Sequence, residues 1–408
     1  MMKREMTYRY IARLLLIVLL LPACSSDEDD GKDTTCYLDI YVYSPAHPMV
    51  TRADAGYVNA STEENKVHSL QIWLFKHSDG ELLGYVSDAP GDLPETGKTY
   101  RIAVTPTIAE GSSSERRVDV YVLANVEAST CGLSFDESTT RAELDAAKIV
   151  DPYFGVISPL SSVSNGLPMS GVLKNEPVVG SFPVLRIGTE NQISTVKLAR
   201  TVSKLRFVLC RIHEDDKPAN QLHSITSITL DGNQIPQEEY LMLNTAFDGS
   251  LNPSEPLADS RMHITPNSYI ASAISFTPPA TSAIPIVENP LDYIYDNQKF
   301  ASVQAYENAL NDFVASGQLA EAGLTYLRES DKKLKGTISY RVESDPETAS
   351  DRTTVFEMSR AGDFTRDHSW IIYVFFSGGK LQVFDVVQVG IKKWVPTGDP
   401  EGHEFYNW

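Results

Sequence analysis

The chain has 408 residues, of which 42% are hydrophobic and 22% are charged, and its formal net charge is −19. This length allows two ordinary domains, and the composition excludes a disordered chain because enough apolar side chains are available for a packed core. The strong negative charge argues against nucleic acid and anionic membrane surfaces as partners, since both repel an acidic protein.

The first 23 residues are typical of a secretion signal. Basic residues precede Leu14–Leu21, an apolar run that is too short for a bilayer, which needs roughly 20 residues. Leu21-Pro22-Ala23-Cys24 follows, and a small residue before a cysteine resembles the lipobox of bacterial lipoproteins. The resemblance implies cleavage between Ala23 and Cys24 and a diacylglycerol on the Cys24 thiol. The alternative is an unmodified buried cysteine in an ordinary first helix.

An acidic run, Asp27-Glu28-Asp29-Asp30, comes shortly after Cys24. By itself such a run is a solvated tether. Beside a lipobox it also resembles the signal that directs Bacteroidetes lipoproteins to the outer face of the outer membrane. We therefore expect a cell-surface protein that is anchored to the outer membrane by its lipid.

Three further cysteines are Cys36, Cys131 and Cys210. An odd number cannot pair completely within one chain, and the sequence does not say which two would form a disulfide. We expect them to act as small buried hydrophobic residues.

Strand patterns cover most of the chain, with apolar residues alternating between turn residues. In Cys36–Tyr43, the side chains of Cys36, Leu38, Ile40 and Val42 share one face. Trp370–Phe376 is apolar on both faces, which is typical of a central strand, and the following Ser-Gly-Gly-Lys predicts a tight turn. Strands are predicted over residues 36–43, 67–75, 118–124, 196–209, 370–376 and 381–395.

Helical patterns are few. Residues 141–149 form a short candidate, because Thr140 and Glu143 have the spacing of a capping box. Residues 300–317 carry apolar residues at helical spacing and form the best candidate. The surrounding segment, residues 292–335, lacks strand patterning, so we interpret it as an insertion into a β-domain.

Known catalytic patterns are missing from the sequence. It has no His-Glu-x-x-His, no phosphate-binding loop, no dinucleotide glycine fingerprint and no Gly-x-Ser-x-Gly. The acidic runs 27–30 and 214–216 could bind a cation weakly, but such runs are usually solvated loops. Carboxylates that pair only in the folded chain are left open. We predict no catalytic residue, no metal site, no cofactor and no enzymatic activity.

Four further segments are informative as a set, because of the order in which they occur along the chain. They are Glu63–Phe75 with the following Asp79-Gly80, Val118–Asn125, Gly166–Gly171 and Val196–Phe207. With the lipobox, and with Thr365–His368 and Lys393-Trp394-Val395 near the end, they resemble the fimbrillin family of Bacteroidales, the type V pilins (FimA/Mfa-like). No single motif decides this resemblance, but the combination covers nearly the whole chain.

The resemblance implies an all-β fold of two tandem transthyretin-like β-sandwich domains with a few short helices. The first strand would be a propeptide, and the boundary between the domains is expected near Gly188–Ile193. The expected divisions are a signal peptide over 1–23, a tether and first strand over 24–52, the two domains over 53–190 and 191–395, and an appendage over 396–408.

The resemblance also implies assembly by strand exchange. The lipoprotein would be cut after an arginine behind its first strand, and a terminal strand of another subunit would replace the strand that leaves. Arg52 is the matching arginine, so the expected scissile bond is Arg52–Ala53. Other arginines in polar stretches, Arg116, Arg117 and Arg141, do not directly follow the first strand.

The donor strand is expected near the C-terminus, where Val387, Val389 and Ile391 alternate, Val395 has the same period and Trp408 is a terminal anchor. Alternatively, residues 381–395 are simply the last strand of their own domain. The expected partners are other fimbrial subunits, in a homo- or hetero-polymer that supports adhesion. An anchor or tip subunit, and a surface glycan-binding lipoprotein or hydrolase, are the other readings.

Overall fold

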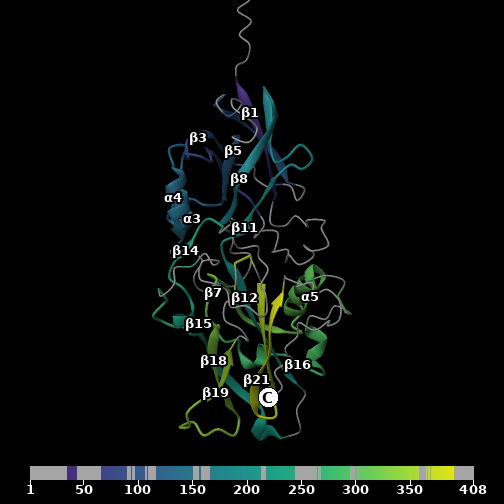
Figure 1. Cartoon of the computed structure of the whole chain (residues 1–408). Helices are drawn as coiled ribbons and strands as arrows, with labels where there is room; N and C mark the ends of the chain where they lie inside the picture. The colour runs from purple at the N-terminus through teal and green to yellow at the C-terminus, as the bar shows by residue number, and fades with distance from the viewer. Residues whose placement is uncertain are drawn as a thin grey trace, which may run out of the picture.

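The described residues form two β-sandwiches that lie end to end along one axis, as Figure 1 shows for the computed structural model. The first sandwich lies at the purple and blue end of the chain and the second at the green and yellow end. The structure describes residues 35–43, 66–89, 93, 97–105, 108, 116–149, 156–157, 166–212, 217–243, 264, 268–294, 299–300, 303–357, 364, 366–367 and 369–389.

The first sandwich has two layers around one apolar core. One layer contains β1 (Cys36–Tyr43), β4 (Lys98–Val104), β9 (Val184–Ile187) and β10 (Thr195–Lys197). The other contains β2 (Leu70–Lys76), β3 (Leu82–Asp88), β5 (Arg117–Ala124) and β11 (Ala199–Arg200). The long strand β8 (Met169–Ser181) belongs to both, because its start pairs with β5 and its end pairs with β9.

The outer face of the second layer is covered by α3 (Ala128–Cys131) and α4 (Arg141–Ala146). Helix α4 begins with the predicted capping box, in which Thr140 and Glu143 satisfy each other's backbone N–H groups. Its Arg141 reaches the buried Asp119 of β5 at 2.7 Å, and His77 lies at the same distance from that carboxylate. Burial alone would raise the pKa of Asp119, but hydrogen bonds from the Asn175 backbone, His77 and Arg141 hold it below its ordinary value.

The second sandwich is built in the same way. One sheet contains β12 (Ser203–Ile212), β17 (Ala320–Leu327), β20 (Ser369–Ser377), β21 (Lys380–Val389), β7 (Val156–Ile157) and β16 (Ile286–Val287). The facing sheet contains β13 (Leu222–Leu230), β15 (Ile274–Phe276), β18 (Lys335–Val342) and β19 (Arg352–Glu357). Phe207 lies between the sheets, with its ring centroid 4.6 Å from that of Phe276 and 5.4 Å from that of Phe356.

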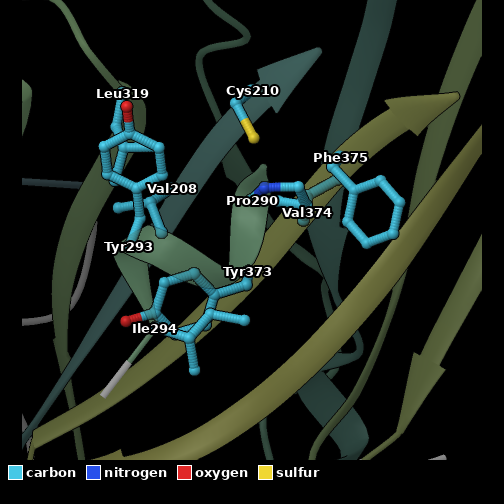
Figure 2. A pocket seen from close by; sticks show the side chains of 9 residues that line it. All are labelled: Val208, Cys210, Pro290, Tyr293, Ile294, Leu319, Tyr373, Val374 and Phe375. Atoms are coloured by element: carbon cyan, nitrogen blue, oxygen red, sulfur yellow. The ribbon is translucent and has the colours of Figure 1, made fainter. Parts of the chain in front are cut away.

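The first of these two sheets is covered on its other face as well, by α5 (Val303–Ala315) and the short helix η7 (Pro290–Tyr293). Figure 2 shows the small apolar hollow that remains there, which has room for about one water molecule. It is lined by Val208, Cys210, Pro290, Tyr293, Ile294, Leu319, Tyr373, Val374 and Phe375.

Short elements complete the described chain. The pair β6 (Lys148–Ile149) and β14 (Glu239–Tyr240) forms a two-stranded sheet at the junction of the sandwiches. The single-turn helices η3 (Pro218–Asn220), η4 (Gly232–Gln234) and η6 (Thr281–Ala283) lie in the connections of the second sandwich. Within the described ranges, no helix is long and apolar enough to cross a membrane.

The predicted all-β fold is confirmed, and the predicted strand over 36–43 has the bounds of β1. The helix expected within 300–317 is α5, with Tyr306 and Leu310 fully buried. The Gly378 and Gly379 turn has φ values of +58° and +75°, which only glycine adopts readily. The three described cysteines, Cys36, Cys131 and Cys210, are buried and form no disulfide with one another.

Three expectations need correction. The single strand predicted over 196–209 is divided into β10, β11 and β12, because the chain passes there from one sandwich to the other. The segment 292–335 is not only an insertion, since it contains β17, which pairs with β12 along seven positions. The change of sandwich falls after Arg200 rather than near residue 190, because Val196 and Leu198 belong to the first core.

Candidate functional site

The first strand, β1, lies inside its sheet and not at an edge. It pairs antiparallel with β4 on one side, from Cys36 opposite Val104 to Val42 opposite Lys98. On the other side it pairs in parallel with β9 at its start and with β10 at its end. The sequence does not reveal this interior position, because β9 and β10 are too short for their pairing to be predicted from it.

One face of β1 is completely buried. Cys36, Leu38, Ile40 and Val42 point into the first core and are at most 1% exposed. They share this core with residues of both layers, including Ile102 of β4. Burial of each such aliphatic side chain stabilises the fold by about 1.5–3 kcal/mol. The alternating apolar residues seen in the sequence are thus the side chains with which β1 fills a groove in the first core.

The other face of β1 is partly open and carries an ion pair. The carboxylate of Asp39 accepts hydrogen bonds from Nε and Nη2 of Arg101 on β4, at 2.8 and 2.9 Å. The side chain of Arg101 is 58% exposed, so this pair contributes little to stability. Its fork geometry does fix how β1 and β4 are aligned.

Strand β4 depends on β1. Among the described strands, β1 is the one with which β4 forms a ladder. If β1 left, backbone N–H and C=O groups would lose their partners on β4 and also on β9 and β10. Such unpaired groups beside an apolar groove favour the addition of another strand.

The sites of processing predicted from the sequence lie outside the described residues. Ala23 and Cys24 precede β1, and Arg52 and Ala53 lie between Tyr43, where β1 ends, and Lys66. Two of the other arginines considered lie in described elements: Arg117 begins β5, and Arg141 forms an ion pair with Asp119. A cut at either of them would not separate β1 alone from the chain.

The predicted donor residues are only partly described. Val387 and Val389 lie in β21, where they pair with Ile371 and Ser369 of β20. Strand β21 is at the end of its sheet order, so among the described strands β20 is its ladder partner. The remaining donor residues, Ile391, Val395 and Trp408, lie outside the described residues.

The sequence motifs meet at the junction of the two sandwiches. Asn125, which ends the second motif, has φ of +58° and is buried. Its Nδ2 donates to the carbonyl of Lys66 in the first motif and to that of Leu167 in the third, at 2.7 and 2.9 Å. At Gly166 an added Cβ would lie 2.3 Å from the Lys66 carbonyl, so this position requires glycine.

The contacts continue into the second sandwich. Thr201 of the fourth motif donates its N–H and its hydroxyl to the carbonyl of Pro168, at 2.9 and 3.1 Å. Its neighbour Arg200 forms a buried ion pair of 2.6 Å with Asp367 of the tail motif. The motifs therefore form one hydrogen-bonded connection between the sandwiches, which their separate patterns did not reveal.

Buried charges complete the junction. Arg366 contacts the carboxylate of Glu239 and lies 4.0 Å from that of Glu329, and all three side chains are at most 2% exposed. Arg328 donates to the carbonyl of Ile149 at 3.3 Å. Burial raises the pKa of Glu239 to about 8 against the opposing effect of Arg366. The charges tie β14 and β6 to the end of β17, so they hold the sandwiches together.

A family model matches the part of the chain that contains the first three motifs and the start of the fourth. Residues 48–200 match the family model of the major fimbrial subunit protein, FimA. For this FimA-matching segment, the predicted resemblance to fimbrial subunits is confirmed. The segment begins after β1 ends and continues through β11, so it covers the rest of the first sandwich. No curated protein matches the chain.

Solved structures resemble the whole chain more distantly. The tip fimbrial protein Mfa3 from Porphyromonas gingivalis, with a C-terminal truncation, is 13% identical, covers 88% of this chain and 100% of its own, and has a TM-score of 0.45. A putative cell adhesion protein from Parabacteroides distasonis is 14% identical over 88% and 97%, with a TM-score of 0.47. A fimbrilin from P. gingivalis is 10% identical over 84% and 90%, with a TM-score of 0.43.

In the described part of the chain, no three His, Cys, Asp or Glu side chains are grouped so that they could hold a metal ion. The buried carboxylates Asp119, Glu239 and Glu329 each face an arginine and hold structural elements together. The feature with a functional geometry is therefore the groove filled by β1.

Proposed function

We propose that this chain is a structural subunit of a cell-surface pilus that supports adhesion, and that it is not an enzyme. In this proposal the chain is exported as an outer-membrane lipoprotein with its lipid on Cys24. Cleavage at Arg52–Ala53 then frees β1, and a strand from another subunit takes its place. The match of residues 48–200 to the FimA family supports the pilus assignment.

The observation that carries the proposal is the way β1 is held. It has four alternating buried side chains, a ladder on each side and no described covalent connection to the sandwich except through residues 44–65. An incoming strand that reburied four aliphatic side chains, at about 1.5–3 kcal/mol each, could offset an association cost of about 4–15 kcal/mol. Such a joint would be long-lived.

The C-terminal segment is the proposed donor toward the next subunit. Its candidate residues are Val387, Val389, Ile391 and Val395, with Trp408 at the end. Strand β21 supports this choice because it lies at the end of its sheet order and leads directly into the remaining residues. Truncation after Trp394 should therefore reduce the amount of polymer on cells, while the shortened subunit is still exported.

The test of the proposal is the N-terminus of the protein on cells. Sheared pili should contain chains that begin at Ala53, and an Arg52→Ala variant should accumulate uncut and acylated. Arg117→Ala is the matched control, and it should leave cleavage unchanged. Pili that contain an intact residue 25–52 segment would show an anchor subunit that keeps β1. A lone, uncut monomer without pili would overturn the assembly role.

A further inference from the structure

The groove sets strict requirements on any strand that replaces β1. All four inward positions are closed to solvent, including the two at the ends, since Cys36 and Val42 are both 0% exposed. A charged side chain at any of them would lose its hydration, which is strongly unfavourable unless an ion pair compensates for it. A fitting strand therefore needs four apolar residues in alternation.

The outward face adds a charge requirement. Asp39 lies opposite Arg101 of β4 and opposite Arg186 of β9 in the two ladders. Arg101 binds its carboxylate through two nitrogens, and Arg186 is exposed on the other flank. Once β1 leaves, two guanidinium groups flank this position. An acidic residue in the incoming strand would restore the pairing, whereas a neutral one would not.

The chain's own C-terminal segment does not meet the first requirement. Three apolar residues alternate there, with a charged residue at either side: in order, Asp385, Val387, Val389, Ile391 and Lys393. In either direction of insertion, placing the three apolar residues in the groove brings Asp385 or Lys393 into the fourth position. An ammonium group or a carboxylate would then be buried at an end of the groove.

The segment fails the charge requirement as well. In each of those alignments, the residue between the two arginines is Gln388 or Gly390. Two insertions would bring the carboxylate of Asp385 near a cation. At the Cys36 position it would lie near Arg116, whose charge acts on the Cys36 thiol, and at the Val42 position it would lie opposite Lys98 of β4, which already pairs with Asp88. Either insertion also requires residues 385–389 to leave β20, with which they pair.

Resting on the function proposed above, we propose that the strand that fills this groove comes from a different kind of subunit. That strand carries four alternating apolar residues and an acidic residue between the second and third of them, on the opposite face. Arg101 and Arg186 select the acid, and the closed ends of the groove reject this chain's own terminus. The subunit therefore joins a polymer of mixed composition and does not stack on copies of itself.

The test uses the full chain with a specific protease site placed between residues 44 and 65. After the cut, β1 remains in the groove and is exchanged for a fluorescent peptide of residues 35–43. Four unlabelled peptides then compete: residues 35–43, residues 385–395, residues 385–395 with Lys393→Val, and residues 385–395 with both Lys393→Val and Gly390→Asp. Fluorescence anisotropy reports how much labelled peptide each one displaces.

The 385–395 peptide should compete at least about tenfold more weakly than the 35–43 peptide, since one lost apolar contact alone has this effect. The doubly substituted peptide should recover most of the loss. The improvement in competition that Gly390→Asp gives should shrink a few-fold when the protein carries both Arg101→Ala and Arg186→Ala. It should stay unchanged in a Lys333→Ala control, whose substitution lies in the second sandwich. Native mass spectrometry should show the same order of peptide occupancy.

The results separate this inference from the proposed function. Equal competition by the 385–395 and 35–43 peptides would overturn the inference and leave strand exchange intact. An unchanged effect of Gly390→Asp in the double arginine variant would overturn the role of the arginines. Failure of every peptide to enter the groove, including the copy of β1 itself, would overturn strand exchange and the inference with it.

Discussion

Strands β1 and β12 occupy equivalent places in their sandwiches, yet they are held very differently. Each is the first long strand of its sandwich, and each has an antiparallel neighbour on one side and a parallel neighbour on the other. In β1 one face is buried and the other is partly open. In β12 residues 203–210 are buried on both faces, between the facing sheet and the layer of α5.

The difference makes β1 the better suited of the two to leave its sandwich, as the proposed function requires. Removal of β12 would open two apolar cores and break the pairing of Arg206 with Glu321 and with Asn311 of α5. Removal of β1 opens one core. Under the function proposed above, the same topology gives a permanent strand in β12 and an exchangeable one in β1, because a second layer covers only β12.

The largest effect is expected from Phe207→Ala in β12. The ring is 0% exposed and packs against Phe276 and Phe356, so its loss should reduce the free energy of unfolding by about 3–5 kcal/mol. Urea unfolding followed by fluorescence measures the change. Val355→Ala on β19 is the control, because that side chain is 64% exposed, and it should have almost no effect. An equal effect of the two variants would contradict the double burial of β12.

The next effect is expected from Ile40→Ala in β1. The side chain is 1% exposed, and its truncation should cost about 2–5 kcal/mol in the first sandwich. Unlike Phe207→Ala, it should also speed the release of β1 after a cut between residues 44 and 65. Size-exclusion chromatography with mass spectrometry measures the retained peptide. Retention of β1 as in the unsubstituted protein would show that the backbone ladders alone hold it.

The junction between the two sandwiches should make the stability of the protein depend on pH. Glu239 has a raised folded pKa, so the folded state keeps a proton that the unfolded state releases. Its contribution is complete below about pH 4.5 and is lost as pH rises toward 8. The free energy of unfolding should therefore fall across this range, and Glu239→Gln should flatten the decline. Identical pH profiles for the two proteins would show that another group is responsible.

The smallest effect is expected from Asp39→Asn on the open face of β1. Because Arg101 is largely exposed, loss of the ion pair should hardly change the unfolding midpoint. The substitution should instead loosen the alignment of β1 and β4, which hydrogen exchange at Arg101 and its neighbours would detect. A large fall in stability would mean that the open face of β1 contributes as much as its buried face.

The sequence predicted the parts of the fold in which local pattern and environment agree. Strand β1 alternates because it is buried on one face, and β20 is apolar throughout because it is covered on both. Strand β17 was missed although it, too, is covered on both faces. It is buried on both faces without alternating, and its sequence, AEAGLTYL, contains no Val or Ile to mark it.

The candidate site could be predicted only in part. The four inward side chains of β1 follow from the period of two, but its position inside the sheet does not. That position depends on β9, which has four residues, and on β10, which has three. The turn after β8 brings β9 beside β1, and a later segment of the chain brings β10 there. The junction was hidden because contacts such as Arg200 to Asp367 join residues 167 positions apart.

The interior position of β1 also has a mechanical consequence. The strand runs roughly along the long axis of the molecule (Figure 1). In a filament assembled as proposed above, a strand bound in this groove would be pulled along its own length under tension. Tension would then load the bonds of both flanking ladders together in shear, and they would not open one after another like a zipper. A groove between two ladders therefore makes a stronger link than an edge with only one.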